Sequence, residues 1–265
     1  MISIGAIVDP AVVSAFLWGA VAASSLLLGG WLACRCTIGR RTLGLLMGFG
    51  AGTLLSAVSL ELVFESLQRS RGSGYPAIGF FAGAFTFFFG DKLIEIFDLR
   101  HRHRIQGRRS EPGASSSLVI PMILGIVLDG VPESMVIGLG RLEHTGVSVA
   151  MLVAVLLSNL PEAIAGTVGM KESGWSRTAI MLLWLLIALA CTGASAAGFS
   201  LFSHASKQWL TLVQCFAGGA ILVMLANSMI PESYEHGGKL AGIFTVIGFA
   251  ISVSIIGFDA TRFGS

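Results

Sequence analysis

The sequence predicts an all-α polytopic membrane protein with eight transmembrane helices and both chain termini on the outer side. The chain has 265 residues, of which 54% are hydrophobic and only 12% are charged. Soluble domains carry about 25% charged residues, so this composition excludes an ordinary soluble fold. Apolar runs of about 20 residues, the length needed to cross a bilayer, recur along the whole chain.

The apolar runs place the spans in order at about residues 11–33, 42–66, 76–98, 118–140, 147–170, 178–202, 209–231 and 240–258. The connections are short except for a basic, polar loop at about 100–117. The first ten residues lack the basic region of a signal peptide, so the first run is expected to stay as a helix. No polar stretch is long enough to fold separately, and residues 1–265 are expected to form a single transmembrane domain.

The distribution of basic residues predicts the orientation, because Lys and Arg concentrate on the cytoplasmic side. If the long loop faces the cytoplasm, that side carries eleven basic residues: Arg35, Arg40, Arg41, Arg100, Arg102, Arg104, Arg108, Arg109, Lys171, Arg177 and Lys239. The outer side then carries five: Arg69, Arg71, Arg141, Lys207 and Arg262. Both termini are therefore expected outside, on the same side as an even number of spans requires.

Small residues at four-residue spacing predict close helix contacts. The second span carries Gly44, Gly48 and Gly52, and the third carries Gly79 and Gly83. Such stripes let helix backbones approach each other in a membrane, where no hydrophobic force drives helices together. We expect these glycines to serve packing.

The fourth span contains a proline and two carboxylates in an apolar run. Asp129 and Glu133 are four residues apart and therefore share one helix face. Pro132 has no N–H to give to the carbonyl of Leu128, which leaves that oxygen free as an acceptor. Ionisable residues within a membrane span indicate a functional site by default.

The fifth span repeats this arrangement. Ser158 and Glu162 are again four residues apart, Asn159 lies one step round the helix, and Pro161 frees the carbonyl of Leu157. If the two helices meet at this depth, carboxylate, amide, hydroxyl and carbonyl oxygens converge, which is the ligand set of a divalent cation.

Three buried carboxylates would cost about 10 kcal/mol if nothing neutralised them. Neither the fourth nor the fifth span contains Lys or Arg, so protons or a metal ion must do so. The alternative is structural: the Pro-Glu pairs are kinks whose acids stay protonated and hydrogen-bonded. Because the pattern occurs twice with matching flanks, we favour the metal site formed by Asp129, Glu133, Ser158, Asn159 and Glu162.

Four further residues are weaker candidates. Glu61 and Glu65 are four apart near the outer end of the second span, where they form an outer mouth, join the site, or are simply solvated. In the seventh span Asn227 precedes a third Pro-Glu pair, and Glu232 is close to the helix end. Asn227 is the better ligand candidate of these two.

Other polar residues are expected to be structural. Asp91, Lys92 and Glu95 in the third span are predicted to pair with one another. The histidines lie outside the span cores and give the central site no imidazole: His101, His103, His144, His204 and His236. The cysteines are expected to remain unpaired: Cys34, Cys36, Cys191 and Cys215.

Eight spans, outer termini, a long histidine-bearing loop after the third span and the two Pro-Glu motifs together resemble the ZIP (Zrt-, Irt-like) metal transporter family. The family patterns are His-Asn-x-Pro-Glu-Gly in the fourth span and His-Glu-x-Pro-Glu-Gly in the fifth. This chain reads Asp-Gly-Val-Pro-Glu-Ser over residues 129–134 and Ser-Asn-Leu-Pro-Glu-Ala over residues 158–163. The resemblance extends over the whole chain and implies that Glu133 and Glu162 bind metal.

The resemblance also implies movement of a divalent metal toward the cytoplasm by alternating access of two helix groups. Asp129 and Ser158 stand where the family has histidines, Gly130 stands for a ligating asparagine, and Asn159 stands for an acid. These departures imply a single-metal site with harder oxygen donors, open to Mn²⁺ or Fe²⁺ as well as Zn²⁺. Near Asn227, the Gly-Gly-Ala and Ile-Pro-Glu sequences are similar to the family's seventh span.

Two other functions stay open at this stage. An intramembrane hydrolase could use the same carboxylates to hold a metal-activated water, although the chain lacks both the His-Glu-x-x-His and the Gly-x-Ser-x-Gly motifs. A non-transporting ZIP-like membrane protein is the third candidate. The expected partners are divalent metal ions (Zn²⁺, Mn²⁺ or Fe²⁺) and the bilayer of the plasma (inner) membrane, with a homodimer as one option for assembly. Nucleic acid is excluded by a net charge of only +2, and no catalytic cofactor is expected.

Overall fold

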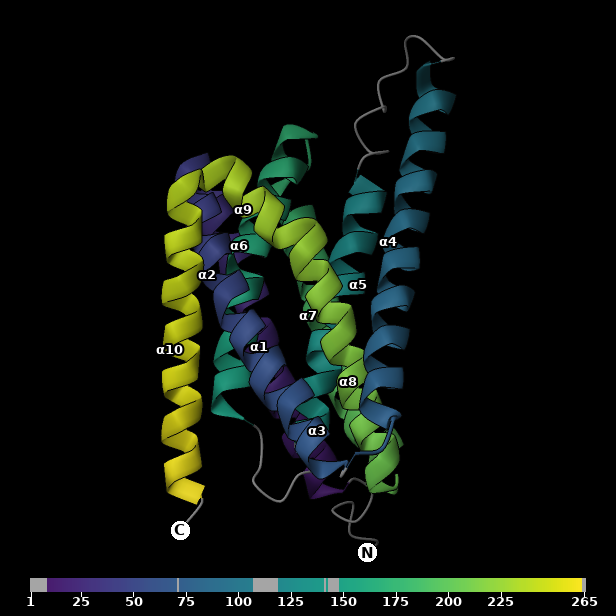
Figure 1. The fold of residues 1–265 in the computed structure, drawn as a ribbon. Coiled ribbons are helices and arrows are strands. Elements are labelled where there is room, and N and C mark those ends of the chain that lie inside the picture. Colours follow the sequence, from purple (N-terminus) through teal and green to yellow (C-terminus); the bar gives the residue numbers. More distant parts are fainter. Residues whose placement is uncertain (1–8, 71, 107–118, 141, 143–147, 264–265) are drawn as a thin grey trace, which may run out of the picture.

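The computed structural model describes residues 9–70, 72–106, 119–140, 142 and 148–263, without the side chains of residues 95, 97–106, 119–123, 126 and 259–263. Within this part of the chain the regular structure is helical, with no strand. Figure 1 shows its elements: α1 (Pro10–Arg35), α2 (Arg40–Ala57), η2 (Val58–Phe64), α3 (Glu65–Arg69), α4 (Tyr75–Gln106), α5 (Val119–Gly140), α6 (Val149–Glu172), α7 (Arg177–Phe202), α8 (Lys207–Met224), η4 (Leu225–Met229), α9 (Ile230–Gly237) and α10 (Lys239–Phe263).

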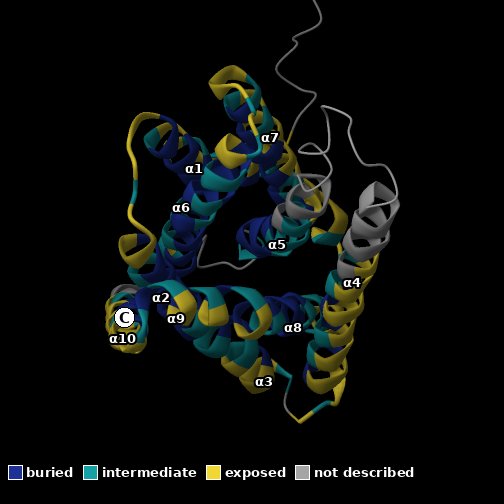
Figure 2. Ribbon diagram, turned by 90° about the horizontal axis from the view of Figure 1, so that it is seen from above, coloured by how far each residue is buried: buried dark blue, intermediate teal, exposed yellow. Residues whose placement is uncertain are grey.

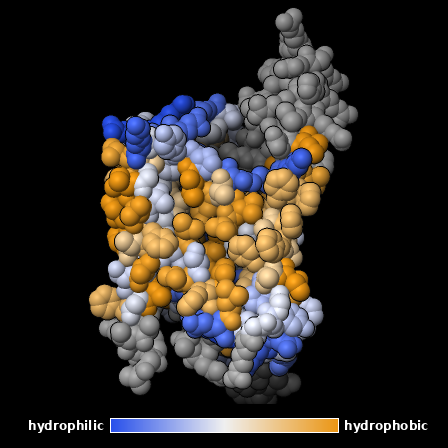
Figure 3. Space-filling view, in the orientation of Figure 1, coloured by the Kyte–Doolittle hydropathy of each residue, from blue (hydrophilic) through white to orange (hydrophobic). Residues whose placement is uncertain are grey.

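Each of the eight predicted spans coincides with a helix to within a few residues, apart from the end of the third. Among the described residues, seven helical stretches are long and apolar enough to cross a membrane. The chain is therefore a multi-pass integral membrane protein. Helix α5, which corresponds to the predicted span 118–140, is not among these seven. The face of the bundle that Figure 3 shows carries a broad apolar surface between more hydrophilic ends.

The predicted loop at 100–117 begins later than expected. Helix α4 continues to Gln106, because no glycine or proline interrupts the chain between residues 91 and 106. The prediction was therefore wrong for the first residues of this loop, including His101 and His103, which are helical in the backbone. The remainder of the loop, 107–117, lies outside the described residues.

Serine residues begin three of the helices. The hydroxyls of Ser148, Ser176 and Ser206 accept hydrogen bonds from backbone N–H groups in the first turns of α6, α7 and α8. Glycines with positive φ follow two helices: Gly174 (φ 81°) follows α6, and Gly238 (φ 62°) joins α9 to α10. Because a side chain would be strained at positive φ, these glycines allow the tight reversals that keep successive helices antiparallel.

The helices form two groups, which Figure 2 shows from above. In the first, α1 packs against α6 and α7, and α5 packs against α7. In the second, α2 packs against α9 and α10, and α4 packs against α8. We name the first the motif group, because it contains both Pro-Glu helices, and the second the rod group. The main contact between the groups joins α2 to α6.

The rod group contains two long helical rods, each interrupted by a π-helical segment: the α2–α3 rod, which includes η2, and the α8–α9 rod, which includes η4. In the α2–α3 rod the segment η2 separates an 18-residue α-helix from a short final turn, and in the α8–α9 rod η4 follows an α-helix of the same length. A π-helical turn shifts backbone carbonyls out of the i→i+4 pattern, and such turns often occur at functional sites. Neither segment was predicted from the sequence.

The glycine stripes pack helices together, as predicted. A Cβ atom on Gly79 or Gly83 of α4 would collide with the carbonyl oxygens of Leu212 or Phe216 in α8. A Cβ on Gly52 of α2 would collide in the same way with a carbonyl of α10. The backbones of these helix pairs are therefore in direct contact, and larger side chains cannot be accommodated without separating them.

The two halves of the chain are equivalent in sequence and in packing. Seven of 24 residues are identical between 43–66 and 210–233 at an offset of 167: Leu43/Leu210, Leu45/Leu212, Phe49/Phe216, Gly52/Gly219, Leu55/Leu222, Glu65/Glu232 and Ser66/Ser233. The carbonyl of Phe49 faces a glycine of α10, and that of Phe216 faces a glycine of α4. Exchanging α1, α2, α4 and α5 with α7, α8, α10 and α6 reproduces the main helix contacts. In the order of spans, three of these pairs are five positions apart and α5 and α6 are one apart. Because both are odd numbers, equivalent spans run in opposite directions, which is the inverted repeat found in many transporter folds.

The first turn of α1 and the last turn of α10 lie at the same end of the bundle (Figure 1). The first turn of α6 lies at this end too, whereas α9 lies at the other. We refer to these as the α3 end and the α9 end of the bundle.

Candidate metal site

The two Pro-Glu segments lie in the middle of α5 and α6. Both helices continue through their prolines, Pro132 and Pro161, without interruption. The sequence-based expectation that each helix carries its carboxylates within a membrane-length segment is therefore met in the backbone. The helices belong to the same group and contact each other directly.

One hydrogen bond joins the two motifs. The side chain of Asp129 in α5 is hydrogen-bonded to that of Glu162 in α6. Two carboxyl groups can form such a bond only if one of them carries a proton, because two carboxylates only accept. Both residues remain half-buried, so solvent-accessible surface is left at this pair.

Glu133 is the most deeply buried of the predicted acids. It is 1% exposed, and its Oε2 has no hydrogen-bond partner among the described residues. A buried polar atom without a partner costs about 1–3 kcal/mol, more for a charged group. Glu133 lies close enough to Asp129 and Glu162 for the charges to interact. An unpartnered oxygen therefore belongs to a side chain that interacts with both other acids.

The neutral members of the predicted set are also buried. Ser158 and Asn159 are 1% and 3% exposed. The Ser158 hydroxyl donates to the carbonyl of Val155 over 3.1 Å, which leaves its lone pairs as acceptors. The carbonyl of Leu157, which Pro161 was expected to free for a metal, faces Gly50 of α2, where a Cβ would lie 2.8 Å from the oxygen. This carbonyl is therefore covered by α2.

Further acids surround the motif residues. Asp91 of α4 lies close enough to interact with Asp129, and Glu232 of α9 with Glu162. The predicted pairing of Asp91 with Lys92 is wrong, because the Lys92 ammonium lies over the Phe88 ring, 5.9 Å from its centroid, and makes no ion pair among the described side chains. The side chain of Glu95 lies outside the described part. Asp91 thus adds negative charge near the motifs.

The described residues contain no group of three or more His, Cys, Asp or Glu side chains placed to hold a metal ion together. Asp129 and Glu162 contact each other directly instead. Asp129, Glu133 and Glu162 are brought into one region, but a metal would have to replace the shared proton to bind both helices.

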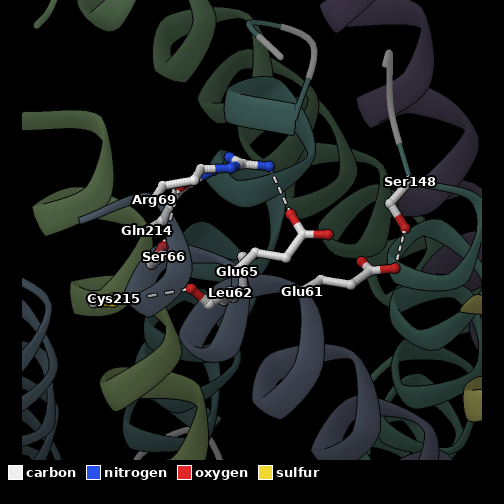
Figure 4. Close-up of polar contacts among 8 residues, drawn as sticks. All are labelled: Glu61, Leu62, Glu65, Ser66, Arg69, Ser148, Gln214 and Cys215. Atoms are coloured by element: carbon white, nitrogen blue, oxygen red, sulfur yellow. Dashed lines mark hydrogen bonds and ion pairs between the residues drawn. The ribbon is translucent and has the colours of Figure 1, made fainter. Parts of the chain in front are cut away.

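Glu61 and Glu65 lie apart from this region, at the α3 end (Figure 4). Glu61 accepts a hydrogen bond of 2.6 Å from Ser148, the N-cap of α6, and Glu65 pairs with Arg69 at 2.6 Å. Fourteen residues of α6 separate Ser148 from Glu162, which corresponds to about 20 Å along the helix. These two glutamates therefore cannot join the motif carboxylates in one site, and only their role at a mouth stays open.

The seventh-span candidates differ from each other. Asn227 is exposed and belongs to η4, whereas Glu232 is half-buried in α9 and electrostatically coupled to Glu162. The preference for Asn227 over Glu232 as a site member is therefore not favoured by the structure. Glu232 is also the repeat equivalent of Glu65.

One residue near the motifs was not singled out from the sequence. Cys191 of α7 faces α5. Its sulfur occupies the space beside Gly130, where a Cβ would lie 3.0 Å away. No local sequence pattern in α7 indicates that Cys191 faces α5. The four cysteines are free, as predicted, and Cys36 is exposed while the others are buried.

The geometry can be compared with known proteins. The chain is 27% identical over 206 residues to the zinc transporter GufA of Myxococcus xanthus, which covers 76% of this chain and 80% of that protein. The chain is similar to a zinc transporter. The similarity to GufA extends over most of both chains and therefore includes more than the two motifs. No protein-family model matches the chain.

Proposed function

We propose that the protein is a ZIP-like transporter that moves a divalent metal, with Zn²⁺ first among Zn²⁺, Mn²⁺ and Fe²⁺, across the plasma (inner) membrane toward the cytoplasm. The observation that carries this proposal is the Asp129–Glu162 hydrogen bond between the two Pro-Glu helices, with the buried, unpartnered Oε2 of Glu133 beside it. The similarity to GufA supports transport over hydrolysis.

The chemistry of the site follows from proton and metal competition. In the proton-bound arrangement Asp129 and Glu162 share a proton, which lowers the charge that must be buried. A divalent cation that displaces this proton gains both carboxylates and the free oxygen of Glu133. Ser158 and Asn159 add neutral oxygen donors, which hard and borderline divalent metals accept.

The architecture supports alternating access. The motif group carries the proposed ligands, and the rod group contains the two glycine-packed pairs α4–α8 and α2–α10. Inverted repeats place a substrate site at their interface and let one group rock or slide against the other. We propose that the motif group moves against the rod group, with the termini on the outer side.

The test is uptake of Zn²⁺ by proteoliposomes that contain the purified protein. Glu133→Gln and Glu162→Gln should each reduce uptake at least about tenfold, because each removes a charged ligand from a buried site. Glu235→Gln, an exposed acid of α9, is the matched control and should transport like the wild type.

Wild-type uptake by both site variants, at equal amounts of folded protein, would reject the proposal. Metal-dependent thermal stabilisation without any flux would instead identify a metal-binding protein that does not transport.

A further inference from the structure

We infer that the hydrogen bond between Ser148 and Glu61 is a releasable latch, which holds the motif group against the rod group at the α3 end and must break before that end opens. This inference rests on the proposed function, because a latch has a role only if the two groups move against each other. It goes beyond that function by assigning a conformational role to a contact outside the metal site.

The bond connects the two groups directly. Ser148 is the N-cap of α6, which belongs to the motif group, and Glu61 lies in η2 of the rod group. The Ser148 hydroxyl donates to Oε1 of Glu61 over 2.6 Å (Figure 4), and the same hydroxyl oxygen accepts from the Met151 N–H at 3.0 Å. Because a hydroxyl has a single proton, its whole donor capacity is used for the contact between the groups.

Side chains rather than packed backbones make this contact. The segment η2 packs on α2, α3 and α8, all of the rod group, whereas α6 packs mainly on α1 and α2. The long side chain of Glu61 bridges the remaining distance to Ser148. Opening at this point therefore requires the loss of a hydrogen bond and not the separation of tightly packed helices, so the contact can be released and formed again.

The bond lies far from the middle of the contact between α2 and α6. In the middle, the Leu157 carbonyl of α6 adjoins Gly50 of α2. Nine residues of α6 separate Leu157 from Ser148, which corresponds to about 14 Å along the helix. When one group tilts against the other about a central contact, the displacement grows with distance from that contact. The Ser148–Glu61 bond therefore resists the tilt where its leverage is large.

The sequence repeat makes the latch one-sided. The two π-helical segments begin at equivalent residues, Val58 and Leu225, at the offset of 167. At this offset Glu61 corresponds to Ser228, whose side chain is short and uncharged. An inverted repeat without such differences would provide similar contacts at both ends. The Glu61 carboxyl therefore adds a stabilising contact to the state in which the α3 end is closed.

An apolar layer lies within one helical turn of the latch. Val58 and Leu62 of η2 and Met151 of α6 belong to one buried cluster, in which Met151 is 3% exposed. Because Met151 is shielded in this state and lies three residues after Ser148, a cysteine introduced there becomes accessible when the groups part at the α3 end.

The first experiment separates the latch from the N-cap. Asp and Asn both accept an N–H at an N-cap as Ser does, but Asn can also donate to Glu61, whereas ionised Asp repels a carboxylate. Met151→Cys is the reporter, in a chain whose exposed cysteine is removed by Cys36→Ser. In the purified protein, Ser148→Asp should raise the rate at which a charged methanethiosulfonate labels the reporter at least about fivefold, whereas Ser148→Asn should keep it within about twofold.

The second experiment closes the latch covalently. Glu61→Cys and Ser148→Cys are combined in the Cys36→Ser chain and joined by a short bifunctional methanethiosulfonate, because two cysteines alone are shorter than the Glu–Ser pair. This bridge should reduce Zn²⁺ uptake by proteoliposomes at least about tenfold, since it prevents the opening on which turnover depends. Dithiothreitol, which cleaves the bridge, should restore uptake.

A bridge within the rod group is the matched control. Ser66 of α3 and Gln214 of α8 form a hydrogen bond of 3.3 Å. Ser66→Cys combined with Gln214→Cys, bridged to the same extent by the same reagent, joins two elements that move together. This bridge should leave Zn²⁺ uptake unchanged.

Normal uptake by the bridged Glu61→Cys/Ser148→Cys variant, or equal labelling in Ser148→Asp and Ser148→Asn, would overturn the latch and leave the proposed function intact. If Ser148→Asp fails to fold, the bridging experiment decides alone. Wild-type protein that takes up no divalent metal would reject the proposed function itself, while the labelling experiment still decides whether the bond keeps the α3 end closed. The two failures are therefore distinguishable.

Discussion

The α2–α3 rod and the α8–α9 rod occupy equivalent places in the two halves of the bundle, yet their final turns have different surroundings. In α3, Glu65 is held in an exposed ion pair with Arg69, and the nearby Glu61 is bonded to Ser148. In α9, the equivalent acid Glu232 is half-buried and interacts with Glu162. The comparison shows one scaffold whose acids make polar contacts at the α3 end, whereas at the α9 end the equivalent acid interacts electrostatically with a motif carboxyl.

The shared scaffold predicts the largest effect. Gly52→Val and Gly219→Val replace equivalent glycines whose Cβ positions collide with backbone carbonyls of α10 and α4. Each should destabilise the protein by about 1–3 kcal/mol or more, because backbone cannot yield as a flexible side chain does. Thermal unfolding in detergent measures both. Gly242→Val is the control, because a Cβ there meets nothing within 4 Å, and a loss in only one of the two halves would contradict their equivalence.

The different surroundings of the equivalent acids predict an intermediate effect. Glu232→Gln should weaken Zn²⁺ uptake or metal affinity several-fold, up to about tenfold, because it removes negative charge near Glu162. Glu65→Gln should change uptake by less than about twofold, since an exposed ion pair is worth only about 0–1 kcal/mol. Equal effects of the two variants in the proteoliposome assay would show that both acids serve the site alike.

The polar contact between Ser148 and Glu61 at the α3 end predicts the smallest effect. Ser148→Ala removes the N-cap of α6 and the partner of Glu61, whereas Ser176→Ala removes only the N-cap of α7. An N-cap contributes about 1 kcal/mol, and the bond to Glu61 should add about 1 kcal/mol more. Ser148→Ala should therefore be the more destabilising variant in thermal unfolding. Indistinguishable shifts would mean that the 2.6 Å contact with Glu61 contributes nothing.

Much of the fold was predictable because its causes are local. Apolar length set the spans, and small-residue spacing indicated the contacts of Gly83 and Gly52 with neighbouring backbones. The end of α4 was missed because the composition of a basic segment resembles a loop while its residues are good helix formers. The π-helical segments have no sequence signature, since they arise from how a whole rod packs.

The candidate site was also predictable where its causes are local to one helix. Position along α5 and α6 placed Asp129, Glu133 and Glu162 at a common depth, and the side chains do interact. Which helices flank that depth depends on tertiary packing. This explains why Cys191 and Asp91 were not recognised as neighbours, and why the carbonyl of Leu157 was assigned to the site although Gly50 covers it.

The covered carbonyl has a mechanical consequence. Pro161 deprives the Leu157 oxygen of its helical partner, and the backbone of Gly50 shields it at the contact between the two helix groups. If α6 slides along α2, this oxygen is uncovered before another group can reach it, at a cost of about 1–3 kcal/mol. The contact therefore stabilises one register of α6 relative to α2, so that a shift between the two helices occurs as a discrete step.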